Sequence, residues 1–131
     1  MTDKELVELA ITASKNSYSP YSKYRVGAAL LCADGTVFTG CNVENASYGA
    51  TNCAERTAVF SAAAHGYRKF LKIAIVGTSG DKFEKPASPC GTCRQVLSEF
   101  CDKDFVVLLF DGEQIIKLKF GELLPYPFTD F

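Results

Sequence analysis

The dipeptide Asp-Gly occurs twice in this chain, each time between two apolar segments of strand length. The paired segments are 26–32 with 36–41 around Asp34-Gly35, and 105–110 with 114–120 around Asp111-Gly112. The first pair is a strong β-hairpin signal, because Asp-Gly adopts the tight turn that joins two antiparallel strands. We expect strands around the second Asp-Gly as well. Four strands are therefore predicted, two toward each end of the chain.

The first 65 residues also contain two segments with the apolar spacing of helices. Thr2-x-x-Glu5 has the form of a capping box, and the apolar residues after it recur at helical spacing to about Asn16. An alanine-rich segment at 53–65 follows Asn52, which is a favourable N-cap residue. We therefore expect one helix before the first hairpin and another after it.

The middle of the chain completes an alternating order of elements. The apolar segment 73–77 is predicted to be a buried strand, and Pro89 precedes a third helix that we expect to end at Cys101. The order α-β-β-α-β-α-β-β predicts an α/β fold with helices packed on a mixed five-stranded sheet. No repeat or linker interrupts the order, so we expect one domain over residues 1–131.

Charge and hydropathy argue against two classes of partner. The chain has 14 Lys and Arg against 15 Asp and Glu, and no basic run longer than Arg68-Lys69, so a nucleic-acid polymer is not the expected partner. No apolar stretch reaches the roughly 20 residues that span a bilayer, and the first five residues are polar and acidic. We expect a cytoplasmic protein that acts on a small molecule and contacts no membrane.

Three of the six cysteines are placed to hold a metal ion. Cysteines in a reducing compartment are thiols or metal ligands more often than disulfides. Cys90 and Cys93 open the third helix, where residues three apart share a face, and Cys53 at the start of the second helix would complete a three-ligand set. Helix N-termini favour anions and lower thiol pKa values, which suits metal-bound thiolates.

The number of ligands decides between a catalytic and a structural zinc site, because three protein ligands leave an open position and four close it. His65 would lie about 18 Å along the helix from Cys53 and cannot share its ion. Cys41 is a possible fourth ligand, while Cys32 and Cys101 have the character of small core residues. A closed four-cysteine site leaves Glu55 without a role, whereas beside an open site its carboxylate can act as general base and general acid.

These residues resemble the small form of the cytidine deaminase family, in which three cysteines hold zinc. The resemblance covers nearly the whole chain. The matching motifs are Cys53-Ala-Glu55, Pro89-Cys90-x-x-Cys93, Pro20-Tyr-Ser-Lys-Tyr-Arg-Val-Gly-Ala-Ala29, Gly40-Cys-Asn-Val-Glu-Asn45, Arg56, Arg94-Gln95 and Glu122-Leu-Leu-Pro125. It implies a three-layer α-β-α fold, one Zn²⁺ per subunit and hydrolytic deamination of cytidine and 2′-deoxycytidine in pyrimidine nucleoside salvage.

The resemblance also implies a role for each site residue. Glu55 would move the protons while water attacks C4 of the cytosine, and Arg56 would donate hydrogen bonds to ligand sulfurs, offsetting the charge of three thiolates. The residues implied to contact the nucleoside are Tyr24, Asn42, Val43, Glu44, Ala54 and Phe128. Tyr24 stands where the family usually has Phe. Phe128 matches an aromatic residue that reaches a neighbouring site, so a homotetramer is implied.

Two other functions remain open. A deaminase of a cytosine-containing antibiotic such as blasticidin S shares the metal motifs and has a similar length. A structural zinc module that only binds a partner would use Cys41 as a fourth ligand. The sequence does not fix the preference between ribose and deoxyribose.

Overall fold

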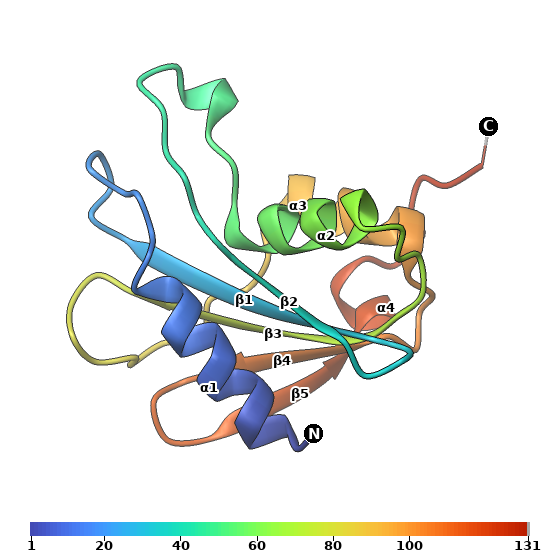
Figure 1. Ribbon diagram of the computed structural model, residues 1–131. Helices are drawn as coiled ribbons and strands as arrows, with labels where there is room; N and C mark the ends of the chain where they lie inside the picture. The colour runs from blue at the N-terminus through green and yellow to red at the C-terminus, as the bar shows by residue number, and fades with distance from the viewer. Residues whose placement is uncertain (131) are drawn as a thin grey trace.

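Five strands form one mixed sheet in the computed structural model, which describes residues 1–130 (Figure 1). The last residue of the predicted domain, Phe131, lies outside the described residues. The sheet order is β2-β1-β3-β4-β5, with only β3 and β4 pairing in parallel. The strands are β1 Arg25–Cys32, β2 Val37–Cys41, β3 Phe70–Thr78, β4 Val106–Phe110 and β5 Ile115–Lys119. The predicted hairpin around Asp34-Gly35, the predicted strands around Asp111-Gly112 and the mixed five-stranded sheet are confirmed.

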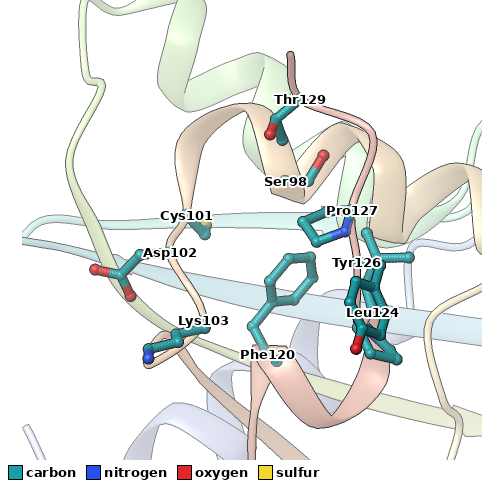
Figure 2. Close-up of a pocket in the computed structure, with 11 residues that line it drawn as sticks. Ser98, Cys101, Asp102, Lys103, Phe120, Leu124, Tyr126, Pro127 and Thr129 are labelled. Atoms are coloured by element: carbon teal, nitrogen blue, oxygen red, sulfur yellow. The ribbon is translucent and has the colours of Figure 1, made fainter.

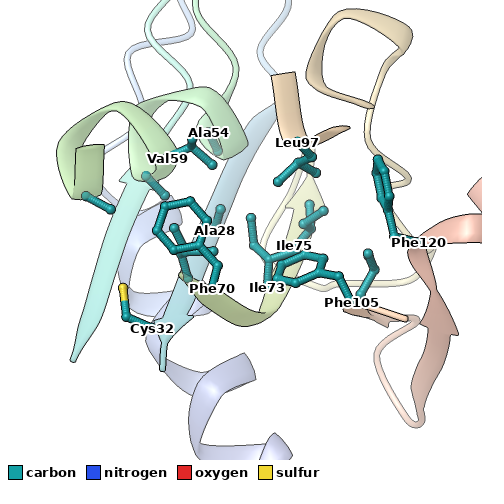
Figure 3. Close-up of a cluster of buried hydrophobic side chains, with 14 of the residues drawn as sticks. Ala28, Cys32, Ala54, Val59, Phe70, Ile73, Ile75, Leu97, Phe105 and Phe120 are labelled. Atoms are coloured by element: carbon teal, nitrogen blue, oxygen red, sulfur yellow. The ribbon is translucent and has the colours of Figure 1, made fainter. Parts of the chain in front are cut away.

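Helices cover both faces of this sheet, as Figure 1 shows. α1 (Asp3–Ser14) packs on one face through Leu6, Val7 and Ala10, which join a buried apolar cluster with residues of β1, β3 and β4. α2 (Ala54–Ala64) and α3 (Gly91–Phe100) lie on the opposite face, over a second and larger cluster (Figure 3). The three-layer α-β-α prediction is therefore confirmed.

Several boundaries differ from the sequence prediction. α2 begins one residue later than expected, with Cys53 as its N-cap, because Asn52 pairs its backbone with Val43 and donates its side-chain amide to Thr57 Oγ1 at 3.0 Å. α1 ends at Ser14, short of Asn16. A 3₁₀ turn at Tyr48–Ala50 and the short α4 (Phe120–Leu123) were not predicted.

Two glycines let the helices approach the sheet closely. A Cβ atom at Gly27 would lie 2.0 Å from the carbonyl oxygen of Ala10 in α1. A Cβ atom at Gly40 would lie 2.5 Å from the carbonyl oxygen of Ala54 and 2.6 Å from the backbone nitrogen of Ala58 in α2. Any larger residue at Gly40 would push the first turn of α2 away from β2.

None of the helices within residues 1–130 has both the length and the apolar character to cross a membrane.

Candidate active site

The sulfur atoms of Cys53, Cys90 and Cys93 lie within 4.8 Å of one another. Cys53 is the N-cap of α2, Cys90 is the N-cap of α3, and Cys93 is in the first turn of α3. The Cys53 and Cys90 sulfurs are 3.8 Å apart, and the backbone N–H of Cys93 donates to the Cys90 sulfur at 3.4 Å. The predicted three-cysteine cluster therefore forms where two helix N-termini meet.

The sheet brings these helix N-termini together. Gly27 of β1 pairs with Cys41 of β2, and Arg25 pairs with Thr78 of β3, so the end of β2, the start of β1 and the end of β3 lie at the same edge of the sheet. The connections that lead into α2 and α3 both leave from this edge, and the two helices contact each other. A site at the carboxyl end of β3 follows from the topology.

The donor set fits a soft divalent cation such as zinc. Hydrogen bonding from the Cys93 thiol lowers the pKa of Cys53 to about 5, against the opposing effect of burial and with support from Arg56. The same hydrogen bond, together with burial, raises the pKa of Cys93. Cys53 is therefore a thiolate at neutral pH, and thiolates are the ligands that zinc prefers in cysteine sites.

No fourth protein ligand joins this cluster in the described part of the chain. The cluster contains neither Cys41 nor His65. Cys41 ends β2, where its backbone carbonyl accepts a hydrogen bond from Thr57, and His65 follows the far end of α2. The donor set is thus three thiols, which is the open arrangement of a catalytic zinc site and lacks the fourth cysteine of a closed structural module.

Arg56 faces the cluster from the first turn of α2. Its Nη2 donates to the Cys53 sulfur at 3.3 Å. Burial works against the charged guanidinium, but hydrogen bonds to the Cys53 and Cys93 sulfurs prevail and raise the pKa of Arg56. Its Nε is buried with no hydrogen-bond partner within residues 1–130. A cation held in this way offsets the negative charge of the thiolates.

Glu55 is buried at 4% exposure in the same turn of α2. Burial raises the pKa of Glu55 to about 7, hydrogen bonds from its own backbone and from Cys93 oppose the rise, and the negative charge of Cys53 adds to it. Glu55 lies two residues after Cys53 and lines the same pocket, so its carboxyl can accept and release a proton near neutral pH.

A pocket of about 450 Å³ opens beside the cysteine cluster. Its size falls within the range of small-molecule sites. Of the residues predicted from the sequence, it is lined by Tyr24, Asn42, Glu44, Cys53, Glu55 and Cys90. Sequence reasoning missed the other lining residues, Ser22, Val26, Thr51, Ile75, Pro86, Ala87 and Ser88. Ser22 and Val26 lie within the matched motif at 20–29 and Ser88 directly precedes the Pro-Cys motif, so the sequence positions of these three hint at the site.

Asn42 and Glu44 line the pocket and also hold its walls in place. Asn42 Oδ1 accepts hydrogen bonds from Ser17 and from the Val26 backbone, and Nδ2 donates to the Tyr24 carbonyl at 2.8 Å. Both carboxylate oxygens of Glu44 accept hydrogen bonds from residues 21–22, and those from Ser22 lower the pKa of Glu44. The Glu44 carboxylate is therefore charged and fixed in orientation.

The Tyr24 ring reaches across the end of β3. Burial and the nearby charge of Glu55 raise the pKa of Tyr24, so its hydroxyl stays protonated at neutral pH. A Cβ atom at Gly77 would lie 2.3 Å from that hydroxyl oxygen. The space left by Gly77 thus accommodates the oxygen that distinguishes this residue from phenylalanine.

Three predicted contact residues are not among those that line the pocket. Val43 forms backbone bridges to Tyr18 and Asn52, and Ala54 is fully buried at the start of α2. Phe128 is 66% exposed, and its carbonyl accepts a hydrogen bond from Gln95 at 2.8 Å. Their contacts with a nucleoside stay predictions.

A larger cavity, of about 540 Å³, lies between the end of α3, α4 and the C-terminal tail, which we define as residues 124–130 (Figure 2). It is lined by Phe120 and Cys101 on one side and by tail residues such as Pro127 on the other. Burial raises the pKa of Cys101 to about 12, which leaves this thiol protonated. None of the predicted catalytic or metal-binding residues lines it, so we assign the chemistry to the smaller pocket.

Comparisons with known proteins agree with this geometry. Residues 1–109 match the family model for the cytidine and deoxycytidylate deaminase zinc-binding region. A cytidine deaminase of Halalkalibacterium halodurans is 47% identical over 130 residues, which cover 98% of this chain and 96% of that protein. A crystal structure of a cytidine deaminase from Burkholderia pseudomallei superimposes with a TM-score of 0.90 at 49% identity, covering 98% of this chain and 100% of that one.

The chain is also similar to a protein with a different named substrate. Blasticidin-S deaminase of Bacillus cereus is 31% identical over 131 residues, which cover 97% of this chain and 92% of that protein. This identity is lower than the 47% of the cytidine deaminase of Halalkalibacterium halodurans.

Proposed function

The chain belongs to the cytidine and deoxycytidylate deaminase family, and from this membership we propose that it deaminates cytidine and 2′-deoxycytidine to uridine and 2′-deoxyuridine, releasing ammonia. The observation that carries the proposal is the cluster of three cysteine sulfurs within 4.8 Å of one another, with the buried Glu55 lining the same pocket. The role in pyrimidine salvage follows from these substrates. The free state of all six cysteines supports a location in the cytoplasm.

In this proposal Cys53, Cys90 and Cys93 hold one zinc ion, which supplies the Lewis acidity that makes water a nucleophile at neutral pH. Glu55 accepts a proton from the water that adds to C4 of the base and delivers it to ring nitrogen N3. It then helps the amino group to leave as ammonia. One C–O bond forms at C4 and one C–N bond breaks, so cytidine becomes uridine.

The remaining pocket residues bind and orient the nucleoside. The carboxylate of Glu44 suits the hydroxyl donors of the sugar, and Asn42 lines the pocket beside it. Tyr24 packs against the nucleoside, Val43 contributes backbone to one wall, and the Ala54 N–H lies at the start of α2 where it can meet the base. Arg56 balances the charge of the thiolates.

The assembly we propose is a homotetramer of single-domain subunits in which the C-terminal tail reaches a neighbouring site. Phe128 is 66% exposed, Phe60 on α2 is 48% exposed, and Tyr126 is fully exposed. In this assembly a neighbouring subunit would cover these side chains. Sedimentation of the active enzyme tests this part: a fully active monomer contradicts the shared site.

A panel of three substrates tests the proposed function. Ammonia release from cytidine, 2′-deoxycytidine and blasticidin S is measured with zinc-loaded protein. We expect turnover of both nucleosides and at least tenfold slower turnover of the antibiotic, as a difference of about 1.4 kcal/mol in transition-state binding gives. Turnover of blasticidin S alone contradicts the proposal and favours the antibiotic as substrate.

A further inference from the structure

Arg94 makes three hydrogen bonds to three different parts of the chain. Its Nε donates to the Pro89 carbonyl at 2.8 Å, its Nη1 to the Leu123 carbonyl at 2.7 Å and its Nη2 to Ser88 Oγ at 2.8 Å. Arg94 follows the candidate ligand Cys93 in α3, and neither the cysteine cluster nor the pocket lining includes it. Its guanidinium therefore donates hydrogen bonds to residues outside the cysteine cluster.

Two of its partners belong to the segment that carries Cys90. Pro89 is fully buried and directly precedes Cys90, while Ser88 lines the substrate pocket. Pro89 has no backbone N–H group, so its backbone can form hydrogen bonds through the carbonyl alone. The position of the Cys90 sulfur thus depends on where Arg94 holds residues 88–89.

The third partner connects this segment to the C-terminal tail. Leu123 is the last residue of α4, and the tail begins at the next residue. The neighbouring Gln95 holds the tail a second time, through its hydrogen bond to the Phe128 carbonyl. Arg94 and Gln95, which are adjacent in α3, thus attach both the segment at 88–90 and the C-terminal tail to this helix.

We propose that Arg94 is a positioning residue that fixes the Cys90 ligand segment and ties it to the C-terminal tail. The proposal rests on the proposed function, because it takes Cys90 to be a zinc ligand. The planar guanidinium presents five N–H donors in a rigid fork, so it can serve three acceptors in three directions. Lysine keeps the charge but has a single nitrogen on a flexible chain, and it cannot span all three partners.

Zinc release to a chromogenic chelator tests the proposal without any nucleoside. We expect Arg94→Lys to release zinc about tenfold faster than the parent protein, the lower end of what losing an outer contact of a metal site produces. The matched control is Arg68→Lys, because Arg68 also donates from one guanidinium to two carbonyls, those of Ala63 and Tyr67, at the far end of α2. This control should release zinc at the parent rate.

A second control separates positioning from general stability. Leu6 of α1 is fully buried on the opposite face of the sheet, so Leu6→Ala lowers the stability without touching the site. Zinc release that is faster in Arg94→Lys than in an equally destabilised Leu6→Ala supports positioning. Release that follows the melting temperature across both variants overturns it.

A milder variant covers the case in which Arg94→Lys does not fold. Ser88→Ala removes only the Nη2 acceptor, and we expect a smaller acceleration of zinc release; release at the parent rate overturns the proposal.

Steady-state kinetics give a further measurement that depends on the tail: Arg94→Lys should raise KM for cytidine as well as lower kcat. A parent protein that binds zinc but releases no ammonia would refute the proposed function and leave the zinc-release test intact.

Discussion

Single side chains in the pocket acquire their chemistry from their surroundings. Burial raises the pKa of Glu55 to about 7, while a hydrogen bond from Cys93 lowers the pKa of Cys53 to about 5. A glutamate and a cysteine in water have the opposite order of acidity. The first turn of α2 thus presents a thiolate and a carboxyl able to carry a proton within three residues.

Arg56 gives the first prediction at this scale. Replacing it by glutamine removes the cation that contacts the Cys53 sulfur, so the thiolate charges are no longer offset. We expect Arg56→Gln to fold but to bind zinc about 10- to 100-fold more weakly. Zinc content after dialysis against a chelator is the measurement, with Arg68→Gln as control. Equal zinc content and turnover in variant and parent would rule out this role.

Gly77 gives the second prediction at the residue scale. A methyl group at this position would come within 2.3 Å of the Tyr24 hydroxyl oxygen and 2.7 Å of the ring carbon that bears it. We expect Gly77→Ala to displace the ring into the pocket and raise KM for cytidine by about tenfold, with a smaller change in kcat. Tyr24→Phe removes the nearest atom, so the double variant should recover part of the loss. An unchanged KM in Gly77→Ala would show that the ring does not bound the substrate site.

The sequence was sufficient to predict that the three cysteines come together near Glu55, because their spacing at two helix starts has a chemical reason. It was not sufficient for the internal hydrogen bonds of Asn42. In the sequence, Asn42 is only a polar residue that follows a strand. Its hydrogen-bond partners Ser17 and Val26 lie close to it only in the folded protein. Arg94 was identified as part of a motif without a role for the same reason.

Among the elements, α2 and α3 determine the site because both begin at the same edge of the sheet. Their order and approximate length could be predicted from the alanine-rich segment after Asn52 and from Pro89 before the third helix. The exact N-cap of α2 could not, since Asn52 is held in an extended conformation by its backbone pairing with Val43. The short α4 carries too few residues to show a helical period.

Gly40 tests how closely α2 must lie on β2. Alanine at this position would place its Cβ atom 2.5 Å from the Ala54 carbonyl oxygen and 2.6 Å from the Ala58 backbone nitrogen, and both are backbone atoms that cannot rotate away. We expect Gly40→Ala to lower the free energy of unfolding by about 1–3 kcal/mol and to weaken zinc binding, because the first turn of α2 moves. Denaturant titration and zinc content are the measurements.

Gly49→Ala is the matched control for this variant, since no atom lies within 4 Å of the added methyl group. It should retain the stability and zinc content of the parent. A Gly40→Ala variant with parent stability would contradict the close packing of α2 on β2.

At the scale of the whole molecule, the ion pair between Asp3 of α1 and Lys72 of β3 should make the free energy of unfolding depend on pH. Lys72 Nζ lies 2.7 Å from Asp3 Oδ1, and this hydrogen bond is the main cause of the lowered pKa of Asp3. A lowered pKa means that the stabilisation is present above the unfolded value of 3.8 and is lost as the pH falls through the folded value. Because the pair is partly exposed, we expect only about 0.5 kcal/mol.

Urea unfolding of Asp3→Asn at two pH values measures this contribution. The variant should be about 0.5 kcal/mol less stable than the parent at pH 7, and the difference should shrink toward zero near pH 2. Glu8→Gln removes a negative charge from the same helix without touching this ion pair, so it is the charge control. A constant difference at both pH values would indicate that the ion pair does not contribute.

The architecture of the whole chain could be predicted in outline, because two pairs of strands around Asp-Gly, one further strand and three helices alternate along the sequence. The assembly could not be derived in this way. The tail carries the exposed aromatic residues Tyr126 and Phe128 on either side of Pro127, but their spacing in the sequence does not identify the surface that would cover them.

The most direct test of the account is the conversion of cytidine by zinc-loaded protein, with Glu55→Gln measured alongside. Glutamine keeps the size of the side chain but cannot carry a proton, so we expect the parent to consume the cytosine chromophore and release one ammonia per cytidine. The variant should bind zinc normally and turn over at least 100-fold more slowly. Equal turnover by both proteins, or none by a folded, zinc-loaded parent, would contradict the assignment of this pocket as the deaminase site.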